Sequence, residues 1–237
     1  MKKIFFSLLS LAFINAQAQS LTADEVVQKY SSAMGGLDNY NKIKTVKLSG
    51  TVTVQDMDLP ITVQIINGKA MRSDVSVMGQ SVTNSYKDGK GWKINPFAGA
   101  ATATDVTGTE LNEFKSQTNL ASQLMDYKKR GYTIELLGQE VTEGANAYKI
   151  KLTSGDKKET TYFIDSKTFL PIKTVTKREM MGQEVEVETY NTDFKEFGGA
   201  KFAMTRTQKT QGEVVQEIKL DKVEVDVTID EKIFDKQ

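Results

Sequence analysis

The sequence contains no cysteine and no histidine. Without cysteine the chain forms no disulfide, has no thiol nucleophile and offers no cysteine at the amino-terminal region to carry a lipid anchor. Without histidine it has no His-based catalytic triad and no imidazole base that titrates near neutral pH. The two absences also remove the ordinary ligands of a zinc site. We therefore expect a protein that is not an enzyme and uses no metal and no cofactor.

Long apolar runs are scarce as well. The apolar residues 4–14 are too few to span a bilayer comfortably, and no later segment reaches the roughly 18 to 20 residues that a membrane helix needs. Two lysines precede this stretch and Ala16-Gln17-Ala18 follows it, a pattern typical of a cleaved secretory signal. We expect residues 1–18 to be removed and residues 19–237 to form one soluble domain in the periplasm.

Charge of one sign is not concentrated anywhere in the chain. The sequence has 31 basic and 31 acidic residues, and removal of the two signal lysines leaves a net charge of about −2. No long run of lysine or arginine is present. We therefore do not expect a nucleic acid partner, and we expect a monomer.

The start of the mature chain is typical of a helix. Thr22 with Glu25 three residues later forms a capping box, and apolar residues follow at helical spacing until Gly35-Gly36. A short helical turn is expected near residues 37–42. From residue 45 onward the apolar residues alternate with a period of two, which is typical of half-buried strands. We expect strands over 45–54, 61–66, 69–77, 80–87, 91–95, 102–106, 132–138, 147–153, 159–165, 170–178, 184–190, 201–208, 214–220 and 222–227.

One interruption breaks this series of strands. Residues 109–131 carry an approximate helical stripe and predict a helix or a pair of helices. Because short turns join the other strands and no helix follows each of them, we expect a mainly β fold with one large, curved antiparallel sheet. Its concave face would be larger than a few helices can cover, and an uncovered apolar face is a candidate ligand site.

The stretch DGKGWKINPFAGAATATD, residues 88–105, contains the only tryptophan. Trp92 and Ile94 fall on one face of the expected strand, so that strand can offer an apolar side to a cavity. Pro96 ends the strand because it has no amide hydrogen to donate, and Phe97 leads into small residues that could form an apolar flap. The alternative is that Trp92 and Phe97 are ordinary core residues.

The order of several short motifs resembles the LolA-type carriers of outer-membrane lipoproteins. The matching positions run from Arg72 through Asp88-Gly89-Lys90 and Trp92 to Asn95-Pro96-Phe97 and Ala101-Thr102-Ala103. The segments YFIDSKTFLPIKTVTKR, TYNTDFKEFGGAKFAM and TIDEKIFDK also look like the wider LolA/LolB-like superfamily. The resemblance covers most of the mature chain.

This resemblance implies an unclosed (half) β-barrel with a few α-helices as a lid over an apolar cavity for acyl chains. It implies that Arg72 acts as a lid latch, because a guanidinium has five donors that can hold several backbone carbonyls of a closed lid. The alternative is an ordinary strand arginine that pairs with Asp74. Met71 and Arg72 must point to opposite faces of a regular strand, so both line the cavity only if a bulge intervenes. The residues expected to bind acyl chains are Met71, Met78, Trp92, Ile94, Pro96, Phe97, Leu124 and Met125.

The expected function is that of a periplasmic carrier. It would bind acylated lipoproteins or lipids, receive them from an inner-membrane releasing complex and pass them to an outer-membrane acceptor, as the resemblance implies. The alternative is a periplasmic lipid- or lipoprotein-sensing regulatory module that signals to a membrane partner. A hydrolase is the weakest of the three hypotheses, because no histidine and no nucleophile elbow is present.

Overall fold

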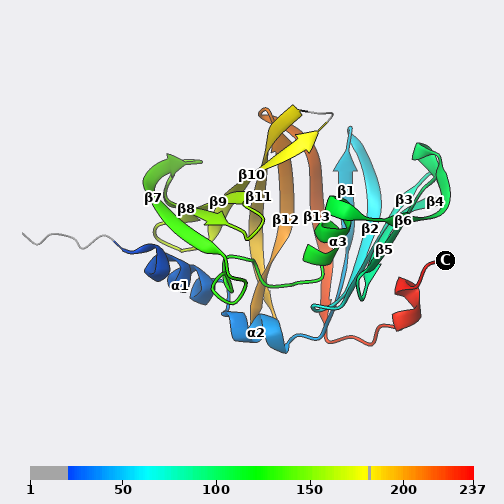
Figure 1. The fold of residues 1–237 in the computed structure, drawn as a ribbon, viewed down its shortest axis with the longest axis horizontal. Helices are drawn as coiled ribbons and strands as arrows, with labels where there is room; N and C mark the ends of the chain where they lie inside the picture. The colour runs from blue at the N-terminus through cyan, green and yellow to red at the C-terminus, as the bar shows by residue number, and fades with distance from the viewer. Residues whose placement is uncertain (1–20, 181–182) are drawn as a thin grey trace, which may run out of the picture.

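The computed structural model describes residues 21–180 and 183–237. They form a 13-stranded antiparallel sheet that is not closed, with the strand order β6-β5-β4-β3-β2-β1-β13-β12-β11-β10-β9-β8-β7 (Figure 1). The helices are α1 Ala23–Ala33, α2 Leu37–Lys42 and α3 Gly108–Ser116, with the short 3-10 helices η1 Pro96–Ala98 and η2 Glu231–Phe234. The strands are β1 Thr45–Val54, β2 Met57–Ile66, β3 Ala70–Val77, β4 Gln80–Lys87, β5 Lys90–Asn95, β6 Ala100–Val106, β7 Thr133–Thr142, β8 Ala145–Thr153, β9 Glu159–Asp165, β10 Pro171–Met180, β11 Gln183–Phe197, β12 Ala200–Thr210 and β13 Glu213–Val225.

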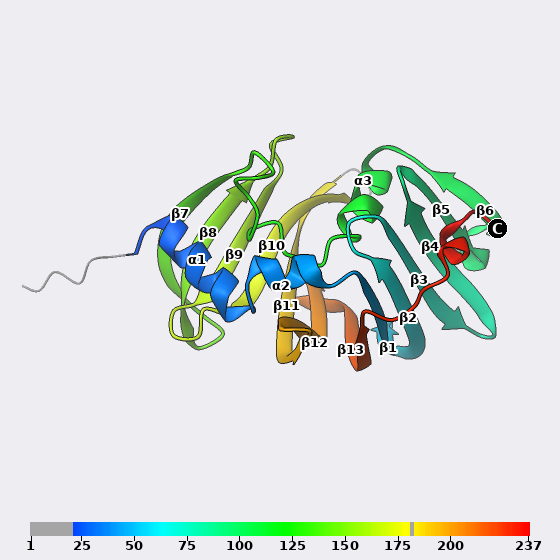
Figure 2. The same cartoon turned by 90° about the horizontal axis from the view of Figure 1, so that it is seen from below.

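The sheet is strongly curved, which gives it a concave and a convex face. Seen from below, α1 and α2 cross one end of the curved sheet and α3 lies within its mouth (Figure 2). The three α-helices pack on the concave face. The C-terminal segment, residues 226–237, instead runs back along the first strands in the sequence. Its short helix η2 packs against β3 and β4. In Figure 1 the strands β3–β6 lie between α3 and this segment.

The larger core lies between α1, α2 and the second half of the sheet. The expected capping box is present: the Thr22 hydroxyl accepts a hydrogen bond from the Glu25 amide, and the Glu25 carboxylate accepts one from the Thr22 amide. This cap starts α1 so that its apolar side faces the sheet. Burial in that core raises the pKa of the Tyr30 hydroxyl. The core contains Val26, Val27, Tyr30, Met34, Tyr40, Ile43, Val46, Leu124, Ile150, Leu152, Tyr162, Ile164, Met204 and Val223, among others.

A second, smaller core lies under α3. Phe114 of the helix packs with Met71 and Tyr86 on the concave face of β3 and β4. Gly91 of β5 permits the close approach, because a Cβ atom there would lie 2.8 Å from Leu111 Cδ1 of α3. Beyond α3 the chain crosses to β7 through residues 117–132, here called the connecting segment. Leu120 of that segment packs against both cores.

The structure confirms the mainly β class, the unclosed antiparallel sheet and the few covering helices. Two element predictions were wrong in detail. The strands expected over 214–220 and 222–227 are one strand, β13, because a register shift opposite Ser49 and Gly50 accommodates an extra residue as a bulge. The helical stripe expected over 109–131 is helical only in α3, and the rest of it forms turns.

The predicted signal peptide, residues 1–18, lies outside the described residues. Within the part of the chain that is described, no helix has both the length and the apolar character needed to cross a membrane.

Candidate functional site

The middle of the concave face carries a continuous apolar surface on three adjacent strands. Val52 of β1 is paired with Leu59 of β2 on one side and with Ile218 of β13 on the other. Ile61 follows Leu59 on the same face of β2 and lies opposite Gly50. We call these four side chains, Val52, Leu59, Ile61 and Ile218, the central strip.

The central strip is separate from the cores that the helices fill. Val52 and Ile61 are 2% and 8% exposed, but neither belongs to the core beneath α1 and α2 or to the core beneath α3. Val63, the next concave residue of β2, already packs in the α3 core. The strip therefore extends the apolar core past the edge of α3, along strands against which α3 does not pack closely.

The cover over the concave face is fastened at its lower edge. Asn67, in the turn between β2 and β3, accepts a hydrogen bond from the Leu120 amide through its Oδ1 atom at 3.3 Å. Its Nδ2 atom donates to the carbonyl oxygens of Tyr40 and Ile43, both at 2.9 Å. One side chain thus joins α2, the β2–β3 turn and the connecting segment. On the other side, Lys93 of β5 forms an ion pair with Glu110 of α3, with a nitrogen–oxygen distance of 2.7 Å.

Arg206 places a positive charge beside the central strip. It lies on β12, two residues beyond the core residue Met204 and opposite Ile218, so its side chain shares the concave face. The side chain is exposed to solvent. Even so, the surrounding protein of the curved sheet lowers the pKa of its guanidinium through burial, and the positive charge of Arg178 lowers it further.

The structure separates Arg72 from Met71. β3 pairs with β2 and β4 without a bulge, so the two neighbours point to opposite faces, as alternation requires. Met71 is 1% exposed and lies in the α3 core. Arg72 points to the convex face, where it forms two bonds to the Asp74 carboxylate, at 2.8 and 2.9 Å, and donates to the Ile233 carbonyl oxygen at 2.7 Å.

Trp92 shares the convex face with Arg72. The two residues are both in register with Ser85 of β4, and the Arg72 guanidinium carbon lies 5.5 Å from the centre of the indole ring. The indole nitrogen donates to the Phe234 carbonyl oxygen at 2.8 Å. Trp92 and, by alternation, Ile94 therefore do not face the concave surface, contrary to our expectation for acyl-chain residues. The strand does offer an apolar side, but it is covered by the C-terminal segment.

The remaining expected acyl-chain residues fall in three different places. Met78 is 89% exposed in the turn between β3 and β4. Pro96 and Phe97 form η1 beyond the end of β5, with Phe97 54% exposed. Leu124, in the connecting segment, is fully buried in the larger core, and its neighbour Met125 is partly buried against the same core.

Met125 also lines an open cavity of about 510 Å³ between α1 and the connecting segment. Val27 and Leu37 contribute apolar surface there, but most of the other lining residues are polar or charged. A second open cavity, of about 390 Å³, lies beside Tyr190 and Leu170 in the same half of the sheet order, between β7 and β11. Within residues 21–180 and 183–237 there is no group of three or more acidic side chains that could hold a metal ion.

Sequence analysis missed Arg206 and Phe234. Arg206 follows Ala200, Phe202 and Met204 in strict alternation, and a charge at the end of such an apolar series was a detectable signal. Phe234 is 1% exposed and anchors the C-terminal segment, but a lone aromatic among charged residues gives no periodic pattern.

Comparison with solved structures identifies the fold. A LolA superfamily protein from Nitrosomonas europaea is 14% identical, with a TM-score of 0.57, over 92% of this chain and 99% of that chain. An outer membrane lipoprotein-sorting protein domain from Vibrio parahaemolyticus is 11% identical, with a TM-score of 0.60, over 90% and 97%. A DUF1329 family protein from Desulfovibrio piger is 10% identical, with a TM-score of 0.61, over 91% and 98%.

The chain therefore has the LolA-type fold that its motifs predicted, over nearly its whole described length. No family model and no curated protein matches the sequence.

Proposed function

We propose that this protein is a periplasmic carrier that binds the acyl chains of lipoproteins on its concave face and delivers them to the outer membrane. The observation that carries the proposal is the central strip, a row of apolar side chains that continues beyond the edge of α3, in which Val52 and Ile61 are buried and Leu59 and Ile218 are partly exposed. Apolar surface next to a covered core is suited to aliphatic chains, because each methylene that leaves water contributes about 0.8 kcal/mol. The likeness in fold to proteins named for lipoprotein sorting supports the same function.

In this proposal α3 and the connecting segment are the lid. They join two cores through Leu120 and are fastened to the sheet by a partly exposed ion pair, Lys93–Glu110. Exposed ion pairs contribute only about 0 to 1 kcal/mol, so most of the hold on the lid comes from the buried Phe114 and from the Asn67 hydrogen bond to Leu120. An acyl chain that moves the lid must replace the apolar contacts that Phe114 makes. Met71, Leu124 and Met125, which lie beneath or within the lid, are the expected acyl-chain residues that fit this site. No covalent step is needed, since transfer depends on differences in affinity between the releasing complex, the carrier and the acceptor.

The experiment that tests this proposal compares two substitutions on one strand, β2. Leu59→Gln places an amide on the central strip, whereas Thr62→Gln places the same amide on the convex face of β2. Each variant is loaded with a purified triacylated lipoprotein and scored for a soluble complex on size exclusion. Leu59→Gln should weaken loading about tenfold or more, because an unpaired amide in an apolar site costs roughly 1 to 3 kcal/mol. Equal loading of both variants would contradict the proposal.

A further inference from the structure

The charge pattern of the concave face is sharply uneven. The concave residues of β1 and β2 are Val46, Leu48, Gly50, Val52, Val54, Met57, Leu59, Ile61, Val63 and Ile65, which carry no charge. β12 contributes Ala200, Phe202, Met204, Arg206, Gln208 and Thr210 to the same face, so Arg206 is the one charged residue there. Arg206 is exposed to solvent, so beside these apolar side chains its positive charge is open to an incoming anion.

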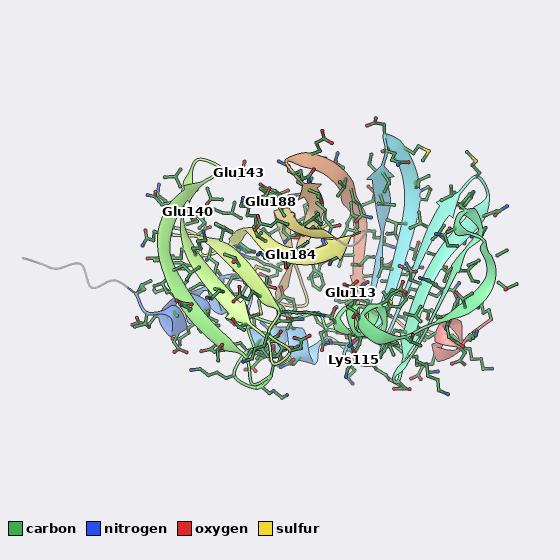
Figure 3. All side chains as sticks on the ribbon, turned by 45° about the horizontal axis from the view of Figure 1, so that its top comes forward. Glu113, Lys115, Glu140, Glu143, Glu184 and Glu188 are labelled. Carbon is green, nitrogen blue, oxygen red and sulfur yellow. The ribbon has the colours of Figure 1, made fainter. Side chains whose placement is uncertain are left out.

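Carboxylates near Arg206 in the strand order face the other way. Figure 3 labels Glu184 and Glu188 of β11, and both are engaged in ion pairs: Glu184 with Lys177 at 2.9 Å and Glu188 with Lys173 at 2.5 Å. These pairs lie on the convex face. Thr189 of β11 pairs with Gln208 on the concave face, so its neighbour Glu188, and Glu184 four residues earlier, point to the convex face. Among the described residues, burial and Arg178 set the pKa of Arg206, and no carboxylate acts to raise it.

A second cation reaches the same region. Arg178 lies near the tip of the β10–β11 hairpin and alternates with Thr174, which pairs with the concave core residue Tyr162. It therefore shares the concave face, and its charge is close enough to lower the pKa of Arg206. Two like charges at the border of an apolar surface repel each other until an anion lies between them.

We propose that Arg206, assisted by Arg178, binds the anionic head of an amphiphile whose acyl chain lies along the central strip. The inference rests on the proposed function, since it needs acyl-chain binding on the concave face. It adds a ligand class that the uncharged acylated cysteine of a lipoprotein does not represent: a chain that carries a carboxylate or phosphate. Ile218 is directly opposite Arg206, so the head and the start of the chain would contact neighbouring residues. The Gln208 and Gln216 side chains, paired across β12 and β13 on the same face, offer further amide donors.

Binding of three amphiphiles and one free anion by the mature protein tests this. The probes are laurate, dodecyl phosphate, the neutral tetraethylene glycol monododecyl ether and inorganic phosphate, each titrated calorimetrically below its micelle concentration. Charge-assisted hydrogen bonds to a guanidinium should give the two anionic amphiphiles about tenfold tighter binding than the neutral one. Arg206→Gln should remove that preference and leave binding of the neutral ether unchanged. Lys209→Gln, three residues along β12 and on the convex face, is the matched control and should keep the preference.

The outcomes separate the inference from the function on which it rests. Equal binding of anionic and neutral amphiphiles by the unaltered protein, or a preference that survives Arg206→Gln, would overturn the inference and leave acyl-chain binding intact. Arg206-dependent binding of inorganic phosphate as tight as that of dodecyl phosphate would show an anion site without a chain, which also overturns it. Failure of every amphiphile to bind would count against the proposed function itself. A larger effect on laurate than on dodecyl phosphate would identify the carboxylate as the preferred head.

Discussion

The Nη1 atom of Arg72 donates a hydrogen bond of 2.7 Å to the main-chain carbonyl oxygen of Ile233. The two residues are joined across the convex face, where Ser85 and Trp92 both donate to the next carbonyl oxygen, that of Phe234, at 3.1 and 2.8 Å. Arg72 therefore holds one backbone carbonyl, that of Ile233 in the C-terminal segment, whereas the family resemblance implies carbonyls of the lid. Its role as a latch for the concave lid remains a prediction.

Replacement of Arg72 by leucine should destabilise the protein by roughly 1 to 3 kcal/mol, because it leaves Asp74 without its partner in a site where their side chains are only 14% and 25% exposed. Arg72→Lys should recover part of the loss, since lysine keeps the charge but cannot form two parallel hydrogen bonds to the carboxylate. Urea unfolding measures both. Lys177→Leu, which breaks an exposed pair with Glu184, is the control and should change stability by less than about 1 kcal/mol.

The same Arg72→Leu variant tests the latch. If Arg72 holds the empty carrier closed, the variant should retain a loaded lipoprotein in a transfer assay to acceptor membranes. Normal release by a variant that is folded at the assay temperature would show that Arg72 only fastens the C-terminal segment.

Phe234→Ala should release the C-terminal segment from β3 and β4 at a cost of about 3 kcal/mol, because the side chain is 1% exposed. The only tryptophan, Trp92, reports on this directly, since it is 3% exposed and bonds to the Phe234 carbonyl. We expect its fluorescence emission to shift to longer wavelength. Phe97→Ala removes a ring that is 54% exposed and should leave the emission unchanged. An unshifted spectrum for Phe234→Ala would contradict the packing described.

The docking of the C-terminal segment should depend on pH. In this segment, the hydrogen bond that Lys69 donates to Glu231 lowers the pKa of Glu231 below the ordinary 4.5. The stabilisation from this pair is therefore full above pH 4.5 and is lost as the pH falls through the lowered pKa. Asp235 raises the pKa of Lys87 above 10.5, so that contribution is full below pH 10.5 and is lost as pH rises through the raised pKa. Docking should thus be tightest between these values. Trp92 emission measured against pH should show the acid limb, and Glu231→Gln should reduce it.

Gly91→Val should force the Leu111 side chain of α3 out of its present position, because a Cβ at residue 91 would lie 2.8 Å from Leu111 Cδ1. The expected loss is about 1 to 3 kcal/mol, despite the preference of valine for strands. Gly155→Val is the matched control, since a Cβ there meets no atom within 4 Å. If both variants unfold at the same urea concentration, α3 does not rest on β5 as described.

Local alternation made most of the strands predictable, because each strand has one buried and one wetter face. β1, β4 and β9 begin and end where the sequence predicts. Alternation could not decide which of the two faces is concave, and for that reason Trp92 was expected in the cavity. That assignment depends on the curvature of the whole sheet and on where the C-terminal segment returns.

The candidate site was predictable only in part. Met71 and Leu124 belong to apolar patterns and lie in the cores at or beneath the cover, while their binding of acyl chains stays a prediction. Arg206 was missed because its isolation from carboxylates arises from contacts between strands that are distant in sequence. The bulge in β13 was missed for the same reason, as only its pairing with Ser49 and Gly50 shows the extra residue.

The central claim is that the concave face binds acyl chains, and native mass spectrometry of the protein purified from a periplasm without detergent tests it most directly. The account predicts an added mass that organic extraction releases as an acylated molecule, and a smaller bound fraction in Leu59→Gln than in Thr62→Gln. A protein that emerges with no added mass and takes up no acylated ligand when one is supplied would contradict it.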